Sequence, residues 1–542
     1  MSENRTSPPS AWRPLKRPFY RMLWIANSFS MIGVWMHDVG AAWLMTSLAP
    51  NPFMVAMIQT ASALPLALLA LPAGALADIF DRKRLILTTL VWRIIVSGGL
   101  GFITVFGYTT PSVLLAATFA LGFGMAMSAP AWQAVIPDVV PRDEVPEAVT
   151  LGAVAFNVTR GVGPALGGFV VAAMGSGGTF LLNAASLFWI TLVIGSWKHT
   201  VAKSALPEER LIGAIRTGIR YVGNSPEVKN ALIHTGAFAI CASAMWALLP
   251  IVAKQYMGLT SVGYGTLLGV FGIGCFLGVL ILPRIRQRFT INQLISITVV
   301  LFSVVLFAMA YVRDFALLAC AMLIAGASWL ALLSSLMASL QSVTPSWVLG
   351  RVMSVHALVF FGTQAAGSAF WGFAAGAIGL PGVLTGAGVL LIASLALTHR
   401  YKVTAGERLD LSPSREYTQA PLVNRPGMEE GPVLVTIEYR IDPMKASDFL
   451  RAMGPMKAIR RKYGAIRWTL FRDVADPSHY RESFAVESWV EHLRQHDRFT
   501  ISDIAILERV YSFNLDGRPK RVDHFIAEPV PKVSAGHLEI EP

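Results

Sequence analysis

Apolar residues in this chain come in long blocks with short polar breaks between them. A block of about 20 apolar residues is the length of helix needed to cross the hydrocarbon core of a bilayer. Twelve such blocks can be delimited, and each is predicted to be a transmembrane helix. The predicted spans are residues 20–47, 53–77, 85–107, 111–131, 149–173, 178–197, 230–253, 262–283, 291–312, 315–340, 353–377 and 380–398.

The chain also repeats itself at a constant offset of 204 residues. Prolines and arginines keep this register over separate regions, which chance similarity between apolar blocks does not readily produce. The sequence therefore predicts two related six-helix halves with a pathway between them. The matching pairs are Gly74 and Gly278, Arg82 and Arg286, Arg84 and Arg288, Pro141 and Pro345, Phe156 and Phe360, Gly163 and Gly367, Gly168 and Gly372, and Gly175 and Gly379.

Composition agrees with a chain that lies mostly in lipid. Of 542 residues, 54% are hydrophobic and only 14% are charged, whereas soluble chains carry about 25% charged residues. The mean hydropathy is +0.54. The basic N-terminus has no small-residue cleavage site after the first apolar block, so a cleaved signal peptide is not expected.

The net charge of +12 is concentrated in the connections on one side of the predicted membrane. If the N-terminus is cytoplasmic, the outer connections hold only Lys254 and Arg313, and the other loop cations are inside. This is the positive-inside pattern, and it predicts a multi-pass protein of the bacterial inner membrane with both termini in the cytoplasm. Because topology accounts for the charge, no nucleic-acid partner is expected.

A polar, proline-bearing linker at residues 400–431 precedes a segment with the pattern of a soluble domain. Its apolar periodicity predicts the order βαββαβ of a small ferredoxin-like α+β domain. The predicted strands are Val433–Ile441, Ile466–Val474, Tyr480–Glu487 and Arg521–Ala527, and the predicted helices are Met444–Tyr463 and Trp489–Phe513.

The C-terminal pattern resembles the dimeric α+β barrel group, which includes small monooxygenases. That resemblance implies a regulatory or dimerising module and a homodimer through this domain. His492 and His496 fall on one helix face, where they are interpreted as solvated surface rather than as metal ligands. No catalytic constellation is found among them. No cofactor and no metal site are expected.

The first predicted cytoplasmic hairpin contains Gly74, Asp78, Arg82 and Arg84. This run resembles the loop between helices 2 and 3 of the major facilitator superfamily, with Ile79 and Asp81 departing from the usual basic residue and glycine. The resemblance implies a gating loop, repeated in the second half by Gly278, Arg286 and Arg288. The alternative interpretation is that these arginines only anchor the topology.

The fifth span contains Gly163, Pro164, Gly167 and Gly168. This Gly-Pro-x-x-Gly-Gly run resembles the signature of superfamily antiporters and implies export rather than import. A tightly packed helix pair is the simpler alternative, since small residues allow close approach in lipid.

Whole segments are also similar to the bacterial branch that includes the enterobactin exporter. The segments are residues 35–45, 130–137 and 263–272, and the resemblance extends over residues 15–400. It implies extrusion of siderophores, drugs or related amphiphiles by proton antiport, with small-molecule substrate, protons and the lipid bilayer as partners.

Three charged residues, Asp38, Arg93 and Arg160, are placed deep in predicted spans. Each costs about 2.5–3.5 kcal/mol at a helix centre on insertion scales, so a functional role is expected. Asp38 is predicted to be the proton-coupling carboxylate, with Arg160 as its counter-ion and His37 beside it. A static buried pair that fixes helix packing is the alternative. Proton-driven exporters of the superfamily often carry an arginine in helix 4, which is absent here between Thr118 and Gly124, and Arg93 or Arg160 is the candidate to replace it.

Six tryptophans within or near the spans are candidates for an aromatic substrate pathway, although interface anchoring explains such residues more simply. They are Trp35, Trp43, Trp132, Trp246, Trp329 and Trp371.

The sequence thus predicts an all-α membrane protein of two six-helix repeats, plus a small C-terminal ferredoxin-like domain. It is expected to be a secondary active transporter that exports small molecules by alternating access, and not an enzyme. The alternatives are a membrane-anchored enzyme or sensor acting through the C-terminal domain, and a lysolipid flippase. The predicted boundaries are an N-terminal tail 1–18, bundles 19–197 and 230–399, a central loop 198–229, the linker 400–431, the α+β domain 432–530 and a tail 531–542.

Overall fold

A computed structural model describes residues 12–79, 81–197, 211–404, 410–412, 427–519 and 521–528. The chain divides into two compact units. The first comprises Met1–Ile212, Asn230–Leu340 and Met353–Ala405, and the second comprises Gly213–Lys229, Gln341–Val352 and Gly406–Pro542. The linker and the two tails predicted from the sequence lie largely outside the described residues.

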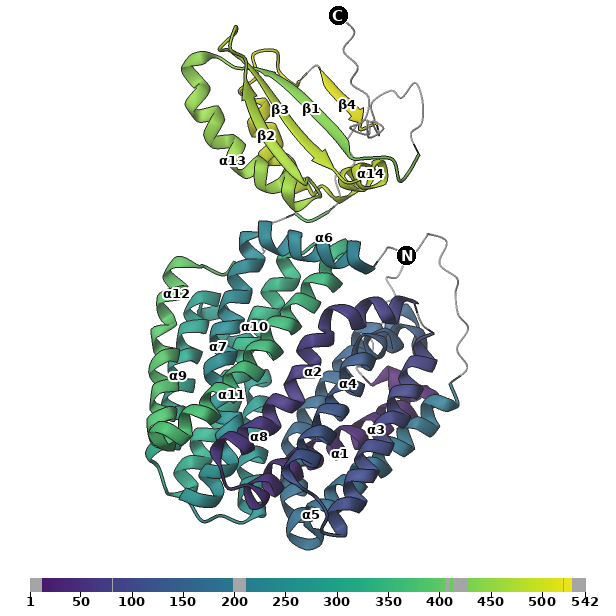
Figure 1. Ribbon diagram of the computed structural model, residues 1–542, viewed down its shortest axis with the longest axis vertical. Coiled ribbons are helices and arrows are strands. Elements are labelled where there is room, and N and C mark those ends of the chain that lie inside the picture. Colours follow the sequence, from purple (N-terminus) through teal and green to yellow (C-terminus); the bar gives the residue numbers. More distant parts are fainter. Residues whose placement is uncertain are drawn as a thin grey trace, which may run out of the picture. The chain divides into compact units, whose positions relative to one another are not determined.

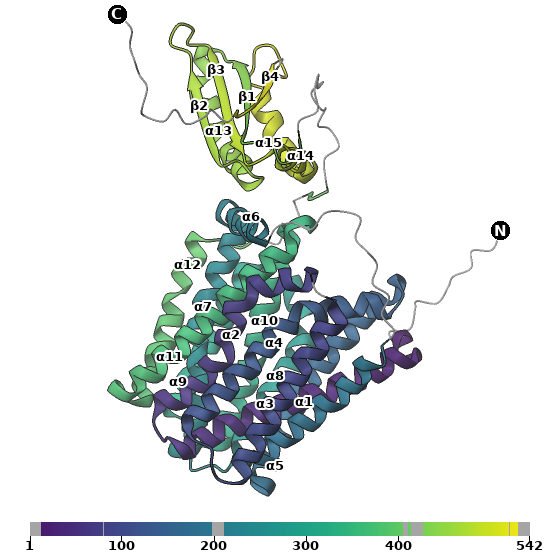
Figure 2. The ribbon, with the colours of Figure 1, turned by 45° about the vertical axis from the view of Figure 1, so that its right-hand side comes forward.

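Long helices build the first unit, with α1–α5 gathered on one side and α7–α12 on the other (Figures 1 and 2). Several of them begin with a proline, for instance Pro18, Pro52, Pro111 and Pro226. Proline suits the first turn of a helix because its missing N–H would have no partner there. The helices are α1 (Pro18–Leu48), α2 (Pro52–Ile79), α3 (Arg82–Val105), α4 (Pro111–Val139), α5 (Val145–Gly195), α7 (Pro226–Ile251), α8 (Ser261–Arg288), α9 (Ile291–Tyr311), α10 (Phe315–Val343), α11 (Ser346–Ala393) and α12 (Leu395–Arg400).

Nine helices of the described residues are long and apolar enough to cross a membrane. Two of them, α5 and α11, are each a pair of helices joined at a glycine whose φ is positive, 72° at Gly175 and 75° at Gly379. Counting each of these two as a pair gives eleven spans, and helix α1, which is 31 residues long, is the twelfth. The twelve predicted spans are therefore present, and the two breaks fall 204 residues apart at equivalent places in the repeat. Glycine is required there because other residues are strained at positive φ.

The two halves of the first unit approach each other closely along α5 and α8. An ideal Cβ on Gly272 would lie 2.4 Å from the Cα of Gly161 and 2.5 Å from the carbonyl oxygen of Arg160. One on Gly168 would lie 2.4 Å from the carbonyl oxygen of Ser261. These distances leave no room for a methyl group, so glycines set the spacing between the halves at this crossing.

We predict that Gly272→Ala destabilises the protein by about 1–3 kcal/mol, because the added methyl meets backbone atoms that cannot rotate away. Gly99→Ala is the matched control, since a Cβ there has nothing within 4 Å. Melting of the purified protein should show a lower Tm for Gly272→Ala only. Equal melting temperatures for both variants would show that the α5–α8 crossing tolerates a wider separation.

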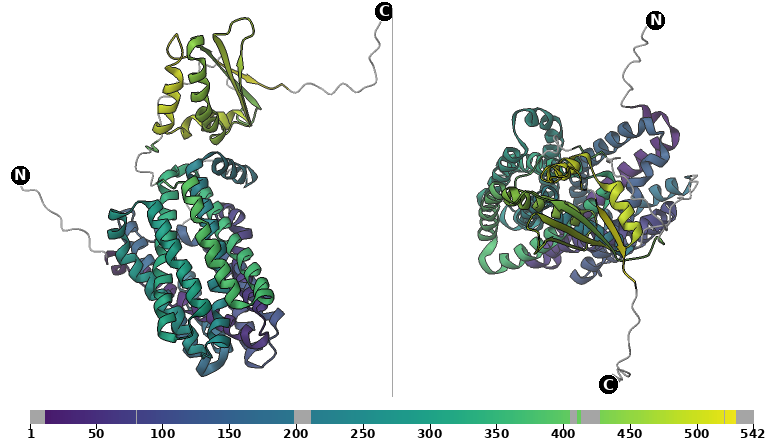
Figure 3. Two further views of the ribbon diagram at one scale, coloured as in Figure 1. Left: turned by 90° about the vertical axis from the view of Figure 1, so that its left-hand side faces the viewer. Right: turned by 90° about the horizontal axis from the view of Figure 1, so that it is seen from above.

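The second unit contains a four-stranded antiparallel sheet in the order β2-β3-β1-β4. Helices cover one face of this sheet (Figure 3). The order and the antiparallel pairing are those of a ferredoxin-like fold, as predicted. The elements are β1 (Val433–Arg440), α13 (Ala446–Lys462), β2 (Arg467–Arg472), β3 (His479–Val486), α14 (Trp489–Arg498), α15 (Ile501–Tyr511) and β4 (Val522–Ile526).

Two details of the second unit differ from the sequence prediction. The helix predicted at Trp489–Phe513 is two helices, because Thr500 caps α15 and forms a reciprocal capping box with Asp503. A further helix, α6 (Leu211–Asn224), lies in the region predicted only as a central loop. The Thr-x-x-Asp spacing at residues 500–503 carried the signal for the first break.

A fully buried ion pair lies in the core of the sheet domain. Arg460 is 1% exposed and Glu482 is 0% exposed, and Arg460 Nε lies 3.0 Å from Glu482 Oε1. Tyr439 and Trp468 each donate a hydrogen bond of 2.9 Å to the same carboxylate. Burial, together with the adjacent Glu482, raises the pKa of Tyr439 well above its usual value, so the phenol remains a donor. The carboxylate is thus fully satisfied.

Helix α6 and residues 341–352 join the sheet domain through ionic and aromatic contacts inside the second unit. Arg216 Nη1 lies 2.9 Å from Glu487 Oε1. The ring of Tyr221 lies 5.8 Å from that of Trp347, and the guanidinium of Arg498 lies 4.4 Å above Trp347. Short membrane-flanking segments are therefore part of the same compact unit as the C-terminal domain.

The repeat gives these contacts a counterpart in the first half. Tyr221 and Trp347 are the equivalents, at an offset of 204, of Arg17 and Asp143. There Arg17 donates two hydrogen bonds of 2.9 Å to the buried Glu144. The hydrogen bond from Arg17 lowers the pKa of Glu144. Arg17, the equivalent of Tyr221, thus makes an ionic contact with the residue after Asp143.

We predict that Glu482→Ala destabilises the C-terminal domain by about 3–5 kcal/mol, because it leaves the Arg460 guanidinium buried without an anion. The control is Glu438→Ala, which removes the more exposed pair with Arg481 from the opposite sheet face and should cost at most about 1 kcal/mol. Proteolysis of the full-length protein across a urea series measures both. Similar losses would mean that burial does not govern the contribution of Glu482.

Candidate functional site

An arginine surrounded by aromatic rings lies within α5. Arg160 is 9% exposed, and five ring centroids lie no more than 6.0 Å from its guanidinium carbon. Cation–π contacts of this length are favourable by about 0.5–2 kcal/mol each. We refer to Arg160 and these five rings as the Arg160 cage. The rings are Trp35 at 5.6 Å, Phe156 at 5.9 Å, Trp246 at 5.9 Å, Phe271 at 5.2 Å and Trp329 at 6.0 Å.

Rings of the cage come from both halves of the first unit. Trp35 is on α1 and Phe156 is on α5, whereas the other three are on α7, α8 and α10. The rings of the second half also contact one another, with Trp246 at 5.1 Å from Phe271 and 5.6 Å from Trp329. The cage is therefore complete only when both halves contribute.

The six tryptophans of the predicted aromatic pathway take different positions. Trp35, Trp246 and Trp329 meet in the cage. Trp43 stacks on Tyr264 at 5.8 Å, and Trp371 donates a hydrogen bond of 2.7 Å to a carbonyl of α7. Trp132 packs in an apolar cluster of the first half.

Two buried donors of the cage have no hydrogen-bond partner among the described residues. Neither Arg160 Nε nor Trp246 Nε1 makes a hydrogen bond there. No described carboxylate forms an ion pair with Arg160, and its electrostatic neighbour is the buried thiol of Cys275. These two donors can therefore donate hydrogen bonds to an acceptor that is not part of the described chain.

Asp38, the predicted proton-coupling residue, lies on α1 and is exposed. It interacts electrostatically with Arg93 on α3 and with Tyr264 on α8. Trp35, one turn away on the same helix, is the α1 residue that faces Arg160. The prediction of Arg160 as the counter-ion is therefore corrected: Arg93, and not Arg160, is the cation that interacts with Asp38.

The side chain of Arg93 packs against Gly124 of α4. An ideal Cβ on Gly124 would lie 2.8 Å from the Cγ of Arg93, so the absence of a side chain on α4 makes room for the arginine. No arginine occurs between Thr118 and Gly124. Arg93 from α3 therefore supplies a cation next to α4.

His37 has a different environment from its neighbour Asp38. Its ring is 3% exposed and lies 4.6 Å from the ring of Phe180 on α5. Neither ring nitrogen has a hydrogen-bond partner among the described residues. The histidine packs between α1 and α5.

The first hairpin is held by polar contacts at the ends of the helices. Arg82 Nη1 lies 3.0 Å from Asp138 Oδ2 at the end of α4. Asp81 caps α3 by accepting a hydrogen bond of 2.8 Å from the backbone N–H of Arg84, and the Arg84 side chain is exposed. Gly74 and Asp78 belong to α2, but their side-chain positions lie outside the described part of the structure.

The equivalent hairpin of the second half is held differently. Arg286 Nη2 donates a hydrogen bond of 3.0 Å to Ser335 Oγ on α10. An ideal Cβ on Gly278 would lie 3.2 Å from the Cα of Ala327, also on α10. Arg288 is exposed near the end of α8. The repeated arginine therefore has an anionic partner in the first half and a neutral one in the second.

The glycine-rich run of the fifth span packs α5 against two helices. Ideal Cβ atoms on Gly163 and Gly167 would lie 2.6 Å from Trp35 Cβ and 2.9 Å from Met36 Cα on α1. The carbonyl oxygen of Pro164 lies 2.6 Å from an ideal Cβ on Gly265 of α8, which also faces Gly168. This run therefore positions α5, and with it Arg160, between α1 and α8.

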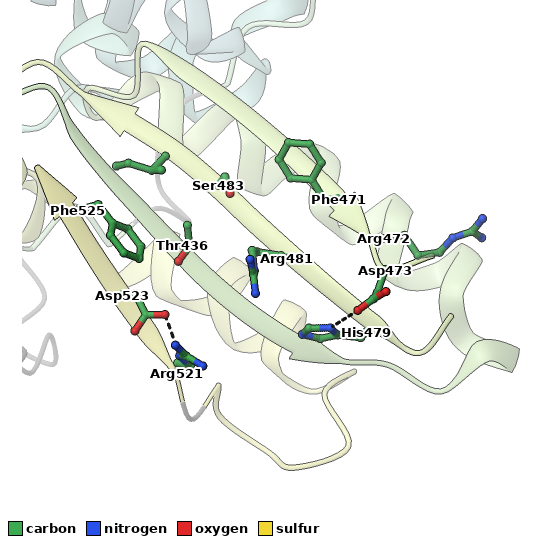
Figure 4. Close-up of a pocket in the computed structure, with 11 residues that line it drawn as sticks. Thr436, Phe471, Arg472, Asp473, His479, Arg481, Ser483, Arg521, Asp523 and Phe525 are labelled. Atoms are coloured by element: carbon green, nitrogen blue, oxygen red, sulfur yellow. Dashed lines mark hydrogen bonds and ion pairs between the residues drawn. The ribbon is translucent and has the colours of Figure 1, made fainter. Parts of the chain in front are cut away.

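The open face of the C-terminal sheet carries a groove of about 610 Å³ (Figure 4). Exposed apolar side chains of Leu434, Phe471 and Phe525 line it. His479 lies 3.2 Å from Asp473, whose pKa is lowered by a backbone hydrogen bond from Ala475 and by that histidine. No group of three metal-ligating side chains occurs among the described residues. Self-association of this domain stays a prediction from the sequence.

His492 is another correction to the sequence analysis. It is 4% exposed rather than solvated, and its ring lies 4.7 Å from that of His524 on β4. The side chain of His496 lies outside the described residues.

Phe156, Phe271 and Tyr264 received no site role from the sequence, where Phe156 appears only as the repeat match of Phe360 and the other two only within the segment 263–272. Phenylalanines are common in membrane spans, so their identity alone carried no signal. Phe271 lies next to Gly272 in the glycine-rich run 263–272. Glycines allow close helix packing in lipid, so this run was the available sign that α8 contacts another helix beside Phe271.

Comparison with known proteins agrees with this architecture. The staphyloferrin A transporter of Staphylococcus aureus (strain NCTC 8325 / PS 47) is 23% identical over 288 residues, which are 53% of this chain and 72% of that protein. The enterobactin exporter EntS of Salmonella choleraesuis (strain SC-B67) is 24% identical over 422 residues, covering 76% of this chain and 96% of that protein.

Solved structures with the same fold are transporters. A bacterial homologue of the human lysosomal transporter Spinster, in an inward-facing and occupied conformation, has a TM-score of 0.57 at 14% identity and covers 72% of this chain and 97% of its own. A POT family transporter has a TM-score of 0.58 at 13% identity, covering 70% and 95%.

Residues 9–531 match the family described as "Transmembrane secretion effector". The family and the named relatives are transporters rather than enzymes. With its repeated six-helix halves, the chain belongs to this transmembrane secretion effector family of the major facilitator superfamily and is a multi-pass membrane transporter of small molecules.

Proposed function

We propose that this transporter exports a siderophore-, drug- or amphiphile-like molecule from the cytoplasm by proton antiport. The observation that carries the proposal is the carboxylate of Asp38, which is exposed although it lies on a membrane-spanning helix and interacts with groups on α3 and α8. An ionisable group in such a position marks an ion pathway in membrane proteins. Both termini are cytoplasmic in this proposal, and the membrane is the bacterial inner membrane.

Proton exchange in this proposal takes place at Asp38. Arg93 favours the ionised carboxylate, and a proton arriving from the outer side neutralises it. Neutralisation removes the electrostatic attraction between Asp38 and Arg93 and so biases the two conformations of the bundle differently. The names of two relatives, a transporter of staphyloferrin A and an exporter of enterobactin, support export of a comparable molecule.

We expect Asp38→Asn to abolish efflux driven by a proton gradient while the protein still reaches the membrane, because the amide cannot bind the proton. The control is Asp314→Asn at the start of α10, where the side-chain oxygen caps the helix and an amide can do the same. A comparison of metabolites in medium and cells, with and without the protein, identifies the transported compound. Its flux in proteoliposomes with an imposed pH gradient then tests the variant, and undiminished flux would refute the assignment of Asp38.

Alternating access in this proposal uses the hairpin at residues 81–84 as a gate. The ion pair between Arg82 and Asp138 connects the start of α3 with the end of α4. Exposed pairs of this kind contribute about 0–1 kcal/mol, so this one can form and break within a transport cycle at small cost.

We predict that Arg82→Ala with Arg84→Ala slows turnover without changing the amount of protein in the membrane. Asp138→Asn should slow transport in the same way if the Arg82–Asp138 pair is responsible. Arg400→Ala is the control, since it removes an exposed arginine at the end of α12, outside both hairpins. Initial rates of flux in proteoliposomes measure the effect. If all of these variants match the wild type, the hairpin arginines serve only to anchor the topology.

A further inference from the structure

We propose that the Arg160 cage is the recognition subsite for a planar organic anion, such as an aryl carboxylate, within the transported molecule. This inference deepens the proposed function and rests on it for the role of the ligand as substrate. Its geometric basis is separate from Asp38, since Asp38 interacts with Arg93 and Arg160 is enclosed by rings.

The cage encloses a guanidinium whose charge no described carboxylate compensates. A buried guanidinium without an anion is costly, and such groups normally pair with a carboxylate or phosphate. Arg160 is 9% exposed, has no carboxylate partner among the described residues, and leaves Nε without an acceptor. Aromatic faces offset part of this cost, but they offer no acceptor in the plane of the guanidinium. The missing partner is therefore an anion.

The donors and rings of the cage favour a flat anion as the partner of Arg160. Guanidinium presents a planar fork of N–H donors that matches the two oxygens of a carboxylate. Trp246 Nε1 supplies another donor without a protein acceptor among the described residues. The surrounding walls are aromatic rings, which favour stacked or edge-on contact with a flat ligand. A flat acid satisfies the fork, the indole N–H and the walls together.

The cage lies between the two halves that move against each other in the proposed transport cycle. Rings on α7, α8 and α10 meet the arginine of α5 only while α5 and α8 are in close contact. Movement of one half against the other separates the two sides of the cage. The affinity for the anion should therefore differ between the two conformations, as a transport cycle requires.

The test uses 4-nitrobenzoate and its neutral analogue 4-nitrobenzamide with the purified full-length protein in lipid nanodiscs. Nitroaromatic rings quench tryptophan fluorescence, and three of the 14 tryptophans lie in the cage. We expect the acid to bind about tenfold to a hundredfold more tightly than the amide, as charge-assisted hydrogen bonds allow. Equal affinities for the two probes would overturn the proposal.

Variants then locate the site. Arg160→Gln should remove the preference for the acid and leave the affinity for the amide unchanged, and Arg160→Lys should weaken acid binding because it keeps the charge but loses the fork. Arg313→Gln is the matched control, since that guanidinium also lies over a ring, Tyr256 at 4.9 Å, outside the cage. Retention of the full acid preference by Arg160→Gln would refute the assignment.

Two further arms separate this inference from its alternatives. Lysophosphatidate carries an anion but no flat ring, and displacement of 4-nitrobenzoate by this lipid at lower concentration than by benzoate would favour a lipid headgroup and overturn the proposal. Asp38→Asn should keep the preference for 4-nitrobenzoate over 4-nitrobenzamide, because Asp38 is not part of the cage, while its absolute affinities follow the altered conformational balance. Normal proton-driven flux in that variant would refute proton coupling at Asp38 and would leave the anion subsite unaffected. Equal affinity of the wild type for the acid and the amide would refute the anion subsite and would leave proton coupling at Asp38 unaffected.

Discussion

The rest of the first unit depends on how a buried guanidinium is accommodated between the two helical halves. In a medium of low dielectric constant, an unpaired charge is expensive unless neighbouring groups compensate for it. Around Arg160 this compensation comes from ring faces contributed by α1, α5, α7, α8 and α10. The need to enclose one cation therefore fixes where helices from both halves must meet.

Glycines make that meeting possible. Gly272 lets α8 approach the backbone of α5 beside Arg160, and Gly163 lets Trp35 lie against the other side of α5. In lipid, helices gain little from burying apolar surface against each other, so close backbone packing has to supply much of the attraction. The same small residues that hold the helices together also offer smooth surfaces along which one half can move.

The C-terminal unit follows the different rules of a water-soluble core. Its buried pair of Arg460 and Glu482 is satisfied by Tyr439 and Trp468, which is the condition under which a buried charge pair is tolerated. Helix α6 and residues 341–352 belong to this unit through Tyr221 and Trp347. Segments next to membrane spans thus belong to the same compact unit as the sheet domain.

The sequence by itself determined the spans, the repeat and the strand order, because apolar block length and alternation report directly on local surroundings. It even located the breaks at Gly175 and Gly379, and it singled out Asp38, Arg93 and Arg160 by their cost in lipid. Which charge faces which partner was decided only by tertiary structure. Spacing along a chain says nothing about the rotation of one helix against another, and that rotation brings Arg93 to Asp38 and surrounds Arg160 with rings from five helices.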